Sequence, residues 1–555
     1  MTKYLKHIVI LIAALVAVNF LGHKVYKRFD LTSDKRYTLS ESAVNIIKDI
    51  ESPIVVDVFL EGEDFPSEFR RLQKETQQLL EEFAAQNKNI VFDFINPLEE
   101  ESTKEQNIQQ LTQRGLTPMQ LSVQESGKSS LAVIFPWALA SYNGQTVIIP
   151  LVKNKIGASQ QELVTNSVQH LEYAFADGFN KLTKPKHQKI AILKGNKQLE
   201  DKYIADFLKK LGEYYFIAPF TLDSVASNPQ NALKEIETYD LVISAKPTEA
   251  FTEEEKLVLD QYTMNGGKSL WLIDAVIMEK DSLYNASGKN YAVTRDLNLT
   301  DFFFKYGVRI NPVMVSSLYS APITLAMGSG SESQFQHLKW PYSPLAGSSS
   351  NHPIVNNLNL VKFDFANQID TLKNQVKKTI LLKSAPLTKL EGTPREVSLD
   401  IVTKEQNPQL FNKGNQTLAV LLEGEFSSVY SNRIKPFKLS GVEDKSEPTK
   451  MIVVADGDVI KNDVVRNTPQ ELGFDRWTGQ LYGNKEFLLN AVNYLLDDNG
   501  LINIRSKEIA VAFLNQEKIA DEKTKWQLIN IALPLVLLGL FGLVFNYIRR
   551  KKFAC

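Results

Sequence analysis

The sequence KSLWLI at residues 268–273 is a nearly continuous apolar run that directly follows Gly266 and Gly267. Three other runs share this character: KIAIL at 189–193, DLVIS at 240–244 and MIVVA at 451–455. Segments with helical periodicity lie between the runs before residue 273, at 202–211, 233–237 and 252–264. Strands without a polar face that alternate with helices predict a parallel sheet covered on both sides. We therefore expect a doubly wound α/β domain over residues 185–505.

The segment at about 275–448 differs in composition from the runs around it. It is rich in Ser, Asn, Pro and Gly, as in AGSSSN at 346–351, and strand-like runs occur at 379–383 and 418–423. We expect an irregular, β-rich and partly mobile insertion in the α/β domain.

Residues 41–184 are predicted to form a separate domain with the order βαβαββ followed by a helix. This order resembles that of a thioredoxin-like domain, and Thr117 and Pro118 stand ahead of a strand where that fold often carries a cis-proline. Residues 61–66 occupy the place of the redox-active pair and contain no cysteine. The resemblance therefore implies a redox-inactive module for binding or scaffolding.

The two ends of the chain carry apolar segments. Residues 528–548 include no charged side chain, which predicts a transmembrane helix at 527–548. Its flanking residues predict the topology: Trp526 marks one interface, and the basic tail at 549–555 stays in the cytoplasm because it contains Arg549, Arg550, Lys551 and Lys552.

The apolar run at 8–22 predicts an N-terminal anchor over residues 1–26, with a cleaved signal peptide as the alternative. Lys24, Lys27 and Arg28 weaken the charge asymmetry of this span. Two spans would place both termini in the cytoplasm and the large domains in the periplasm, joined through stems at 27–40 and 506–526.

The composition excludes several classes of function. The net charge is −1, so nothing in it indicates nucleic-acid binding. The single cysteine is Cys555, so the exported part can form no disulfide and no thiolate metal site. No GxxxxGK[ST] loop is present, and the six histidines are not spaced as metal ligands. We expect no catalytic residue, cofactor or metal ion.

Four polar residues follow predicted strands of the α/β sheet. Asp456 and Asp458 come after the strand at 451–455, while Lys246 and Asp274 end neighbouring strands. Open α/β sheets bind ligands at this edge, so these residues are candidates for a ligand site. The alternative is ordinary turn chemistry, which Asp-Gly-Asp also favours.

The whole layout resembles the GldG family of gliding-motility-associated ABC transporter auxiliary proteins of Bacteroidetes. The resemblance depends on RFDLTSDKRYTLS at 28–40, SPIVVDVFLEGEDFPSEFRRL at 52–72, GGKSLWLID at 266–274 and MIVVADGD at 451–458. It implies a subunit held beside a polytopic permease, with a separate cytoplasmic P-loop ATPase. The second domain also resembles a degenerate class I glutamine-amidotransferase fold that lacks the nucleophilic cysteine.

We therefore expect a non-catalytic inner-membrane subunit of an ABC transporter associated with gliding motility. Its predicted partners are the permease, the ATPase, the lipid bilayer and other envelope proteins. The alternatives are a structural envelope scaffold for the motility machinery and an envelope hydrolase or transferase.

Overall fold

The computed structural model describes residues 38–62, 65–100, 102–125, 128–328, 333–497, 500–507 and 516–553, with a few positions before residue 33. The chain forms two compact units, Met1–Glu508 and Ile509–Cys555. The first unit contains a four-stranded and a nine-stranded sheet, which confirms the predicted α/β class.

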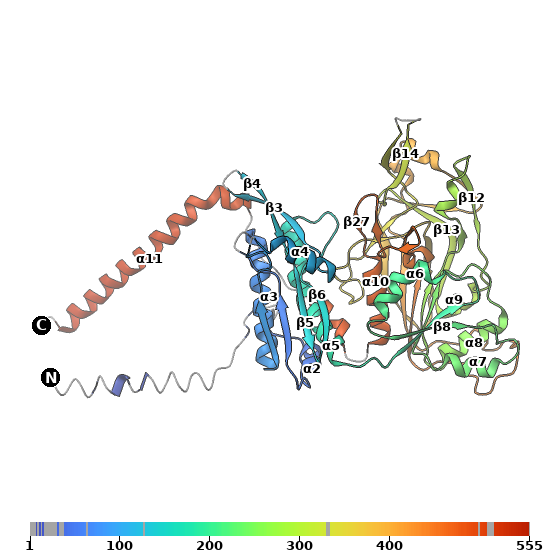
Figure 1. The fold of residues 1–555 in the computed structure, drawn as a ribbon, viewed down its shortest axis with the longest axis horizontal. Helices are drawn as coiled ribbons and strands as arrows, with labels where there is room; N and C mark the ends of the chain where they lie inside the picture. The colour runs from blue at the N-terminus through green and yellow to red at the C-terminus, as the bar shows by residue number, and fades with distance from the viewer. Residues whose placement is uncertain are drawn as a thin grey trace. The chain divides into compact units, whose positions relative to one another are not determined.

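The largest sheet has the strand order β17-β16-β19-β22-β23-β10-β9-β7-β8 (Figure 1). Five of its strands run parallel: β7 (Lys189–Lys194), β8 (Phe216–Thr221), β9 (Leu241–Ala245), β10 (Lys268–Leu272) and β23 (Thr449–Val454). They include all four apolar runs from which the sequence predicts a sheet. The side chains of β7, β9, β10 and β23 are mostly buried, which explains why these strands show no polar face, whereas β8 at the edge of the sheet is largely exposed or half-buried.

The sheet is parallel, as predicted, only across these five strands. The other four strands continue the sheet in antiparallel pairings: β22 (Thr417–Gly424), β19 (Lys377–Ser384), β16 (Leu345–Gly347) and β17 (Val361–Lys362). All four come from the segment predicted to be an irregular insertion. A strand buried on both faces is apolar whichever way it runs, so the sequence pattern does not indicate its direction.

Helices cover both faces of this sheet. α6 (Asp201–Leu211) and α10 (Asn484–Leu496) share a core with Ile190 and Ile192 of β7. The alternate residues Ala191 and Leu193 belong to a second core. Three helices contribute to that core: α7 (Pro229–Ile236), α8 (Glu253–Met264) and α9 (Thr300–Tyr306). α8 begins with a capping box formed by Thr252 and Glu255.

The remainder of the insertion forms smaller β-structures. β13 (Val308–Ser317) lies between β18 (Asn367–Thr371) and β20 (Thr388–Gly392), and β12 (Lys289–Thr294) lies between β11 (Val276–Ile277) and β21 (Arg395–Ser398). β14 (Ile323–Met327) pairs with β15 (Gln334–Leu338). The insertion is β-rich as predicted. Four short strands follow β23: β24 (Val464–Val465), β25 (Thr468–Pro469), β26 (Phe474–Asp475) and β27 (Gln480–Leu481).

Residues before 185 form a four-stranded sheet in the order β2-β1-β5-β6. β1 (Ile54–Val58) runs parallel to β2 (Ile90–Phe94) and antiparallel to β5 (Trp137–Tyr142), which pairs with β6 (Gln145–Pro150). The helices of this region are α2 (Glu41–Ile47), α3 (Ser67–Gln86), α4 (Lys104–Gln113) and α5 (Gln160–Thr183). Phe83 of α3 packs edge-on against Phe179 of α5, with ring centroids 5.2 Å apart.

Two expectations for this region are wrong. The predicted order βαβαββ places two strands after the second helix, but four strands, β3 to β6, lie between α4 and α5. The strand after Pro118 is β3 (Met119–Glu125), which forms a separate hairpin with β4 (Lys128–Ile134). The Thr117–Pro118 peptide bond is trans, and the cis bond in the described part of the chain is Thr393–Pro394. Since β5 rather than β3 pairs with β1, Pro118 does not precede the strand for which a cis-proline was expected.

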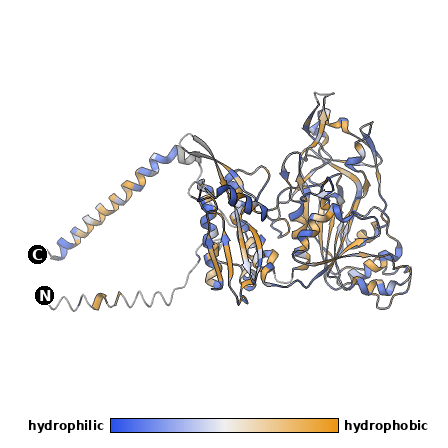
Figure 2. Ribbon diagram, viewed as in Figure 1, coloured by the Kyte–Doolittle hydropathy of each residue, from blue (hydrophilic) through white to orange (hydrophobic). Residues whose placement is uncertain are grey.

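The second unit contains α11 (Gln516–Phe553). Residues Asp521–Lys552 of this helix have a mean hydropathy of 2.5 in their most apolar part, and none of that part is buried. In Figure 2, where the ribbon is coloured by residue hydropathy, much of this helix has the colour of apolar residues. Within the described residues, α11 is the only helix long and apolar enough to span a membrane. Most of the N-terminal run at 8–22 lies outside the described residues.

Candidate functional site

Three neighbouring parallel strands end beside one another and place charged residues together. Lys246, Asp274 and Asp456 follow β9, β10 and β23, whose residues pair in register. Lys246 has a positive φ of 55° and donates its backbone N–H to the carbonyl of Leu272. A Cβ at Gly457 would lie 2.4 Å from Cγ of Lys246, so only glycine fits against this lysine.

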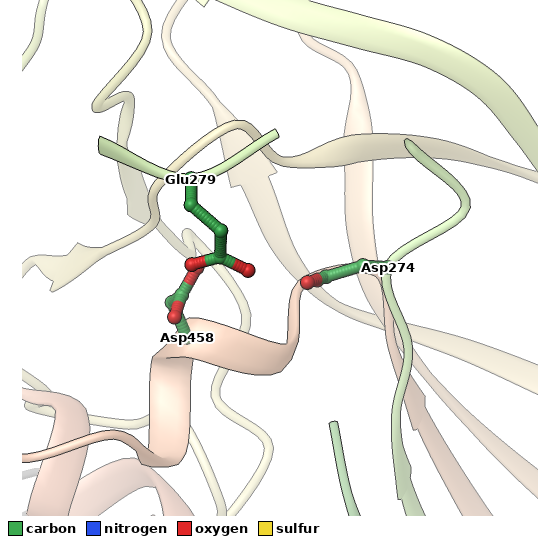
Figure 3. A group of neighbouring side chains, drawn as sticks. All are labelled: Asp274, Glu279 and Asp458. Atoms are coloured by element: carbon green, nitrogen blue, oxygen red, sulfur yellow. The ribbon is translucent and has the colours of Figure 1, made fainter. Parts of the chain in front are cut away.

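The ammonium of Lys246 lies among three carboxylates. Nζ is 2.6 Å from Oδ1 of Asp458, 2.8 Å from Oε1 of Glu279 and 3.4 Å from Oδ2 of Asp274. Figure 3 shows the carboxylates of Glu279 and Asp458 directed toward each other. Burial alone would lower the pKa of Lys246, but the charges of Asp458, Asp274 and Glu279 outweigh it and raise that pKa well above its ordinary value.

The acidic residues have different protonation tendencies. Burial raises the pKa of Asp274 and of Glu279. Burial also acts to raise the pKa of Asp458, but Lys246 and Lys461 prevail and hold that pKa below its usual value. Burial and the nearby charge of Asp458 raise the pKa of Asp456 well above normal. The site therefore combines a firmly ionised carboxylate with carboxyl groups that protonate more readily.

Asp456 joins backbone segments instead of facing the ion pairs. Its Oδ2 accepts the N–H of Asp364 at 2.6 Å, and its Oδ1 accepts the N–H of Asp458 at 2.7 Å. The side chain is fully buried. It thus connects the loop after β23 to the segment between β17 and β18, which is the turn role that the sequence leaves open for this residue.

A second charged group adjoins the first. Oδ1 of Asp364 lies 3.1 Å from Nζ of Lys280, while its Oδ2 lies 3.4 Å from Nζ of Lys362. Ser343 donates its hydroxyl to the same carboxylate. Burial opposes ionisation of Asp364, but the two lysines overcome it and hold its pKa far below the usual range. Lys461 belongs to the first group, because its Nζ is 3.6 Å from Asp458 and 3.8 Å from Glu279.

A cavity of about 540 Å³ opens beside these groups. Its walls include Glu279, Lys280, Asp364, Asp458 and Lys461. Of the four candidates from the sequence, only Asp458 reaches the cavity, whereas Lys246, Asp274 and Asp456 stand behind it. The structure therefore brings the four residues together but gives them different positions relative to the open space.

Five charged residues of this region were not predicted from the sequence: Glu279, Lys280, Lys362, Asp364 and Lys461. Four of them belong to the insertion, where no strand pattern indicated proximity to the sheet edge. Lys461 directly follows η5 (Gly457–Ile460), which contains Asp458, and was the one residue that its position could have revealed.

The carboxylate oxygens of Asp274, Glu279 and Asp458 lie within 4.8 Å of one another, close enough to surround a metal ion. The ammonium of Lys246 already lies between these carboxylates, so a side chain of the protein compensates their negative charge where a metal ion would bind. Ser343 is fully buried, so its hydroxyl cannot reach a substrate in the cavity. The arrangement can present charged and hydrogen-bonding groups to a ligand, which is a binding function.

The residues predicted to determine topology lie on α11. Trp526 is 53% exposed and donates its indole N–H to Glu522 at 2.8 Å. The basic residues Arg549, Arg550, Lys551 and Lys552 form the last turns of this helix and are exposed. Their position at one end of an apolar helix is typical of a membrane anchor.

Comparisons with known proteins match most of the chain. A family model described as "ABC-type uncharacterized transport system" (ABC_transp_aux) matches residues 187–491, and a model of a domain of unknown function matches residues 33–141. An uncharacterized protein of Borreliella burgdorferi is 19% identical over 541 residues, covering 95% of this chain and 94% of that protein.

Similar solved structures include the mmIFT52 N-terminal domain, with a TM-score of 0.32 and 13% identity over 56% of this chain and 98% of that one. A ThuA-like protein from Parabacteroides merdae has a TM-score of 0.28 and 12% identity over 56% of this chain and 91% of that one. Both TM-scores are too low to indicate a shared fold.

Proposed function

Because the chain belongs to the family of ABC-type uncharacterized transport system proteins, we propose that it is a non-catalytic auxiliary subunit of an ABC transporter. The family match over residues 187–491 is the observation that carries this proposal. The apolar helix α11 supports it, since an exposed helix of this kind can pack on a permease within the bilayer.

The proposed role is that of a GldG-type subunit for gliding motility. It would have two spans, at 1–26 and 527–548, with both termini in the cytoplasm and residues 41–505 in the periplasm. The basic end of α11 supports this orientation. ATP hydrolysis would come from a separate P-loop subunit, because the sequence has no Walker loop.

We assign two domains to the periplasmic part. Residues 41–184 would be a thioredoxin-like domain, which the sheet order β2-β1-β5-β6 supports. Residues 185–505 would be a degenerate amidotransferase-like domain. Lys246 directly follows its strand β9, and three carboxylates surround the ammonium of this lysine. Such a lysine is a poor nucleophile, since its raised pKa keeps it protonated.

Affinity isolation of the tagged full-length chain from gently solubilised membranes, followed by mass spectrometry, tests the transporter role. We expect a polytopic permease and a P-loop ATPase in stoichiometric amounts. A matched variant that ends before residue 516 and so lacks α11 should recover less of both. A monodisperse chain without either partner, under conditions that preserve other membrane complexes, would refute the proposal.

A further inference from the structure

The cavity at the carboxyl end of the main sheet has the size and position of a small-molecule site. Its volume of about 540 Å³ lies in the usual range for such sites, roughly 300–1,000 Å³. Open α/β sheets bind ligands at this end of their strands. Its walls include residues of η1 (Lys280–Leu283), η5 and the short strands after β23, together with residues of α6, β14 and β17.

The charges that line the cavity are almost balanced. Five basic and six acidic side chains contribute to its walls. Several are already paired, such as Lys280 and Lys362 with Asp364, or Lys461 with Asp458. A charged ligand would have to disrupt such pairs and leave a partly buried charge without its partner, which is costly. A neutral ligand with many hydroxyl groups avoids this cost, because each hydroxyl can donate to a carboxylate and accept from an ammonium.

Aromatic rings lie among these charged groups. Tyr284 and Trp477 line the cavity and are 55% and 44% exposed, and Tyr203 and Tyr482 also face it. Arg476 lies 4.7 Å from the centroid of the Trp477 ring, so charged and aromatic surfaces are adjacent here. The C–H face of a sugar ring is apolar and packs on aromatic faces, while its equatorial hydroxyls bind the polar groups at its edge.

We propose that this cavity binds a neutral saccharide of about the size of a disaccharide. Tyr284 provides the aromatic surface for one ring, and the side chains of Lys280, Lys461 and Asp458 bind its hydroxyl groups. Saccharide binding depends on this cavity alone, so its test is independent of whether the chain associates with a permease.

Isothermal titration calorimetry on the full-length protein tests this assignment, in a detergent without a sugar headgroup. The probes are cellobiose, N,N′-diacetylchitobiose and maltose, with inorganic phosphate and the dipeptide Ala-Ala as charged comparisons. We expect saturable binding of at least one disaccharide and none of phosphate or Ala-Ala. Binding of a charged probe alone, or of none of the five by a protein whose thermal unfolding shows that it is folded, would overturn the proposal.

Two matched variants locate the binding. Tyr284→Ala should lower the affinity for the disaccharide by roughly threefold to tenfold, which corresponds to the loss of one aromatic contact. Tyr291 is 60% exposed and does not line the cavity, so Tyr291→Ala should leave the affinity unchanged. Equal effects of the two substitutions would place the sugar elsewhere and contradict the assignment. Because both tyrosines are largely exposed, both variants should fold, and their thermal unfolding verifies this.

Discussion

Lys246 holds three acidic side chains that would otherwise repel one another in a confined space. Its side chain is only 3% exposed, and Asp274 and Asp458 are nearly as enclosed. Removing one partner of a buried ion pair leaves the opposite charge uncompensated, at a typical cost of about 3–5 kcal/mol. Lys246 therefore stabilises the edge of the sheet mainly because, without it, the neighbouring carboxylates would lack a compensating positive charge.

Replacement of Lys246 by Met should lower the free energy of unfolding by about 3–5 kcal/mol at neutral pH. The loss should shrink between pH 7 and pH 5. The pKa values of Asp274 and Glu279 are already raised, and without the lysine they would rise further, so these groups stabilise the variant when protonated and lose that effect as pH rises. Urea unfolding of the full-length chain in detergent, at several pH values, measures the difference.

Lys377→Met is the matched control, since Lys377 pairs with Glu423 at 3.1 Å but is 72% exposed. This substitution should cost less than about 1 kcal/mol. A deficit for Lys246→Met that stayed constant across the pH range would mean that carboxylate repulsion is not its cause.

At the scale of helices and strands, the sequence predicts the elements that bury apolar side chains at a regular period. β7, β9, β10 and β23 lie where apolar runs indicate them, and α8 starts at the capping box of Thr252 and Glu255. Strand direction and pairing are different, because they depend on contacts between distant segments. In the antiparallel pair of β22 and β23, Leu421 lies opposite Ile452, and no local sequence pattern predicts this pairing.

The candidate site also contains residues that a local sequence pattern indicates and residues that only contacts between distant segments bring together. Lys246, Asp274, Asp456 and Asp458 could be predicted because each lies close to the carboxyl end of a recognisable strand. Glu279 and Asp364 reach the site through the insertion, whose path only the folded chain defines. Three of the four predicted residues therefore stand behind the cavity, and most residues that line it were not predicted.

The loop between β6 and α5 is connected to α10 and η6 (Leu501–Ser506) by buried charges. Glu486 of α10 pairs with Lys153 and with Arg505, whose Nη2 lies 2.7 Å away. Burial favours protonation of Glu486, but these two cations prevail and lower its pKa to about 2. The side chains of Lys153 and Arg505 are 9% and 2% exposed, so they depend on this carboxylate for charge compensation.

The depressed pKa of Glu486 predicts a loss of stability in acid. Its contribution is complete above the unfolded value of 4.5 and disappears as pH falls toward 2, by at most about 3 kcal/mol. The carboxylate is 28% exposed, which reduces this figure through solvent screening. Urea unfolding at pH 6, 4.5 and 3 should show wild type and Glu486→Gln converging on acidification.

Glu249→Gln provides the comparison for that series, because Glu249 belongs to an exposed pair with Lys197. It should follow wild type closely at every pH. If Glu486→Gln remained equally less stable than wild type from pH 6 to pH 3, the buried ion pair would not be the source of the acid sensitivity.

The whole molecule combines an α/β unit that has a ligand-sized cavity with a separate apolar helix. The family match covers the larger sheet, and α11 lies outside it. A binding unit held at a membrane acts at the local concentration that its anchor imposes, so the orientation of α11 determines which compartment the cavity samples.

The orientation can be read from the only cysteine of the sequence, Cys555. Since the basic end of α11 is predicted to stay in the cytoplasm, a membrane-impermeant maleimide should label Cys555 only after spheroplasts are permeabilised. In a Cys555→Ser chain, the exposed position Ser349→Cys should be labelled in intact spheroplasts. Labelling of Cys555 from outside would place the basic tail in the periplasm and invert the anchor. The cavity would then sample cytoplasmic ligands, and the proposed periplasmic role would be wrong.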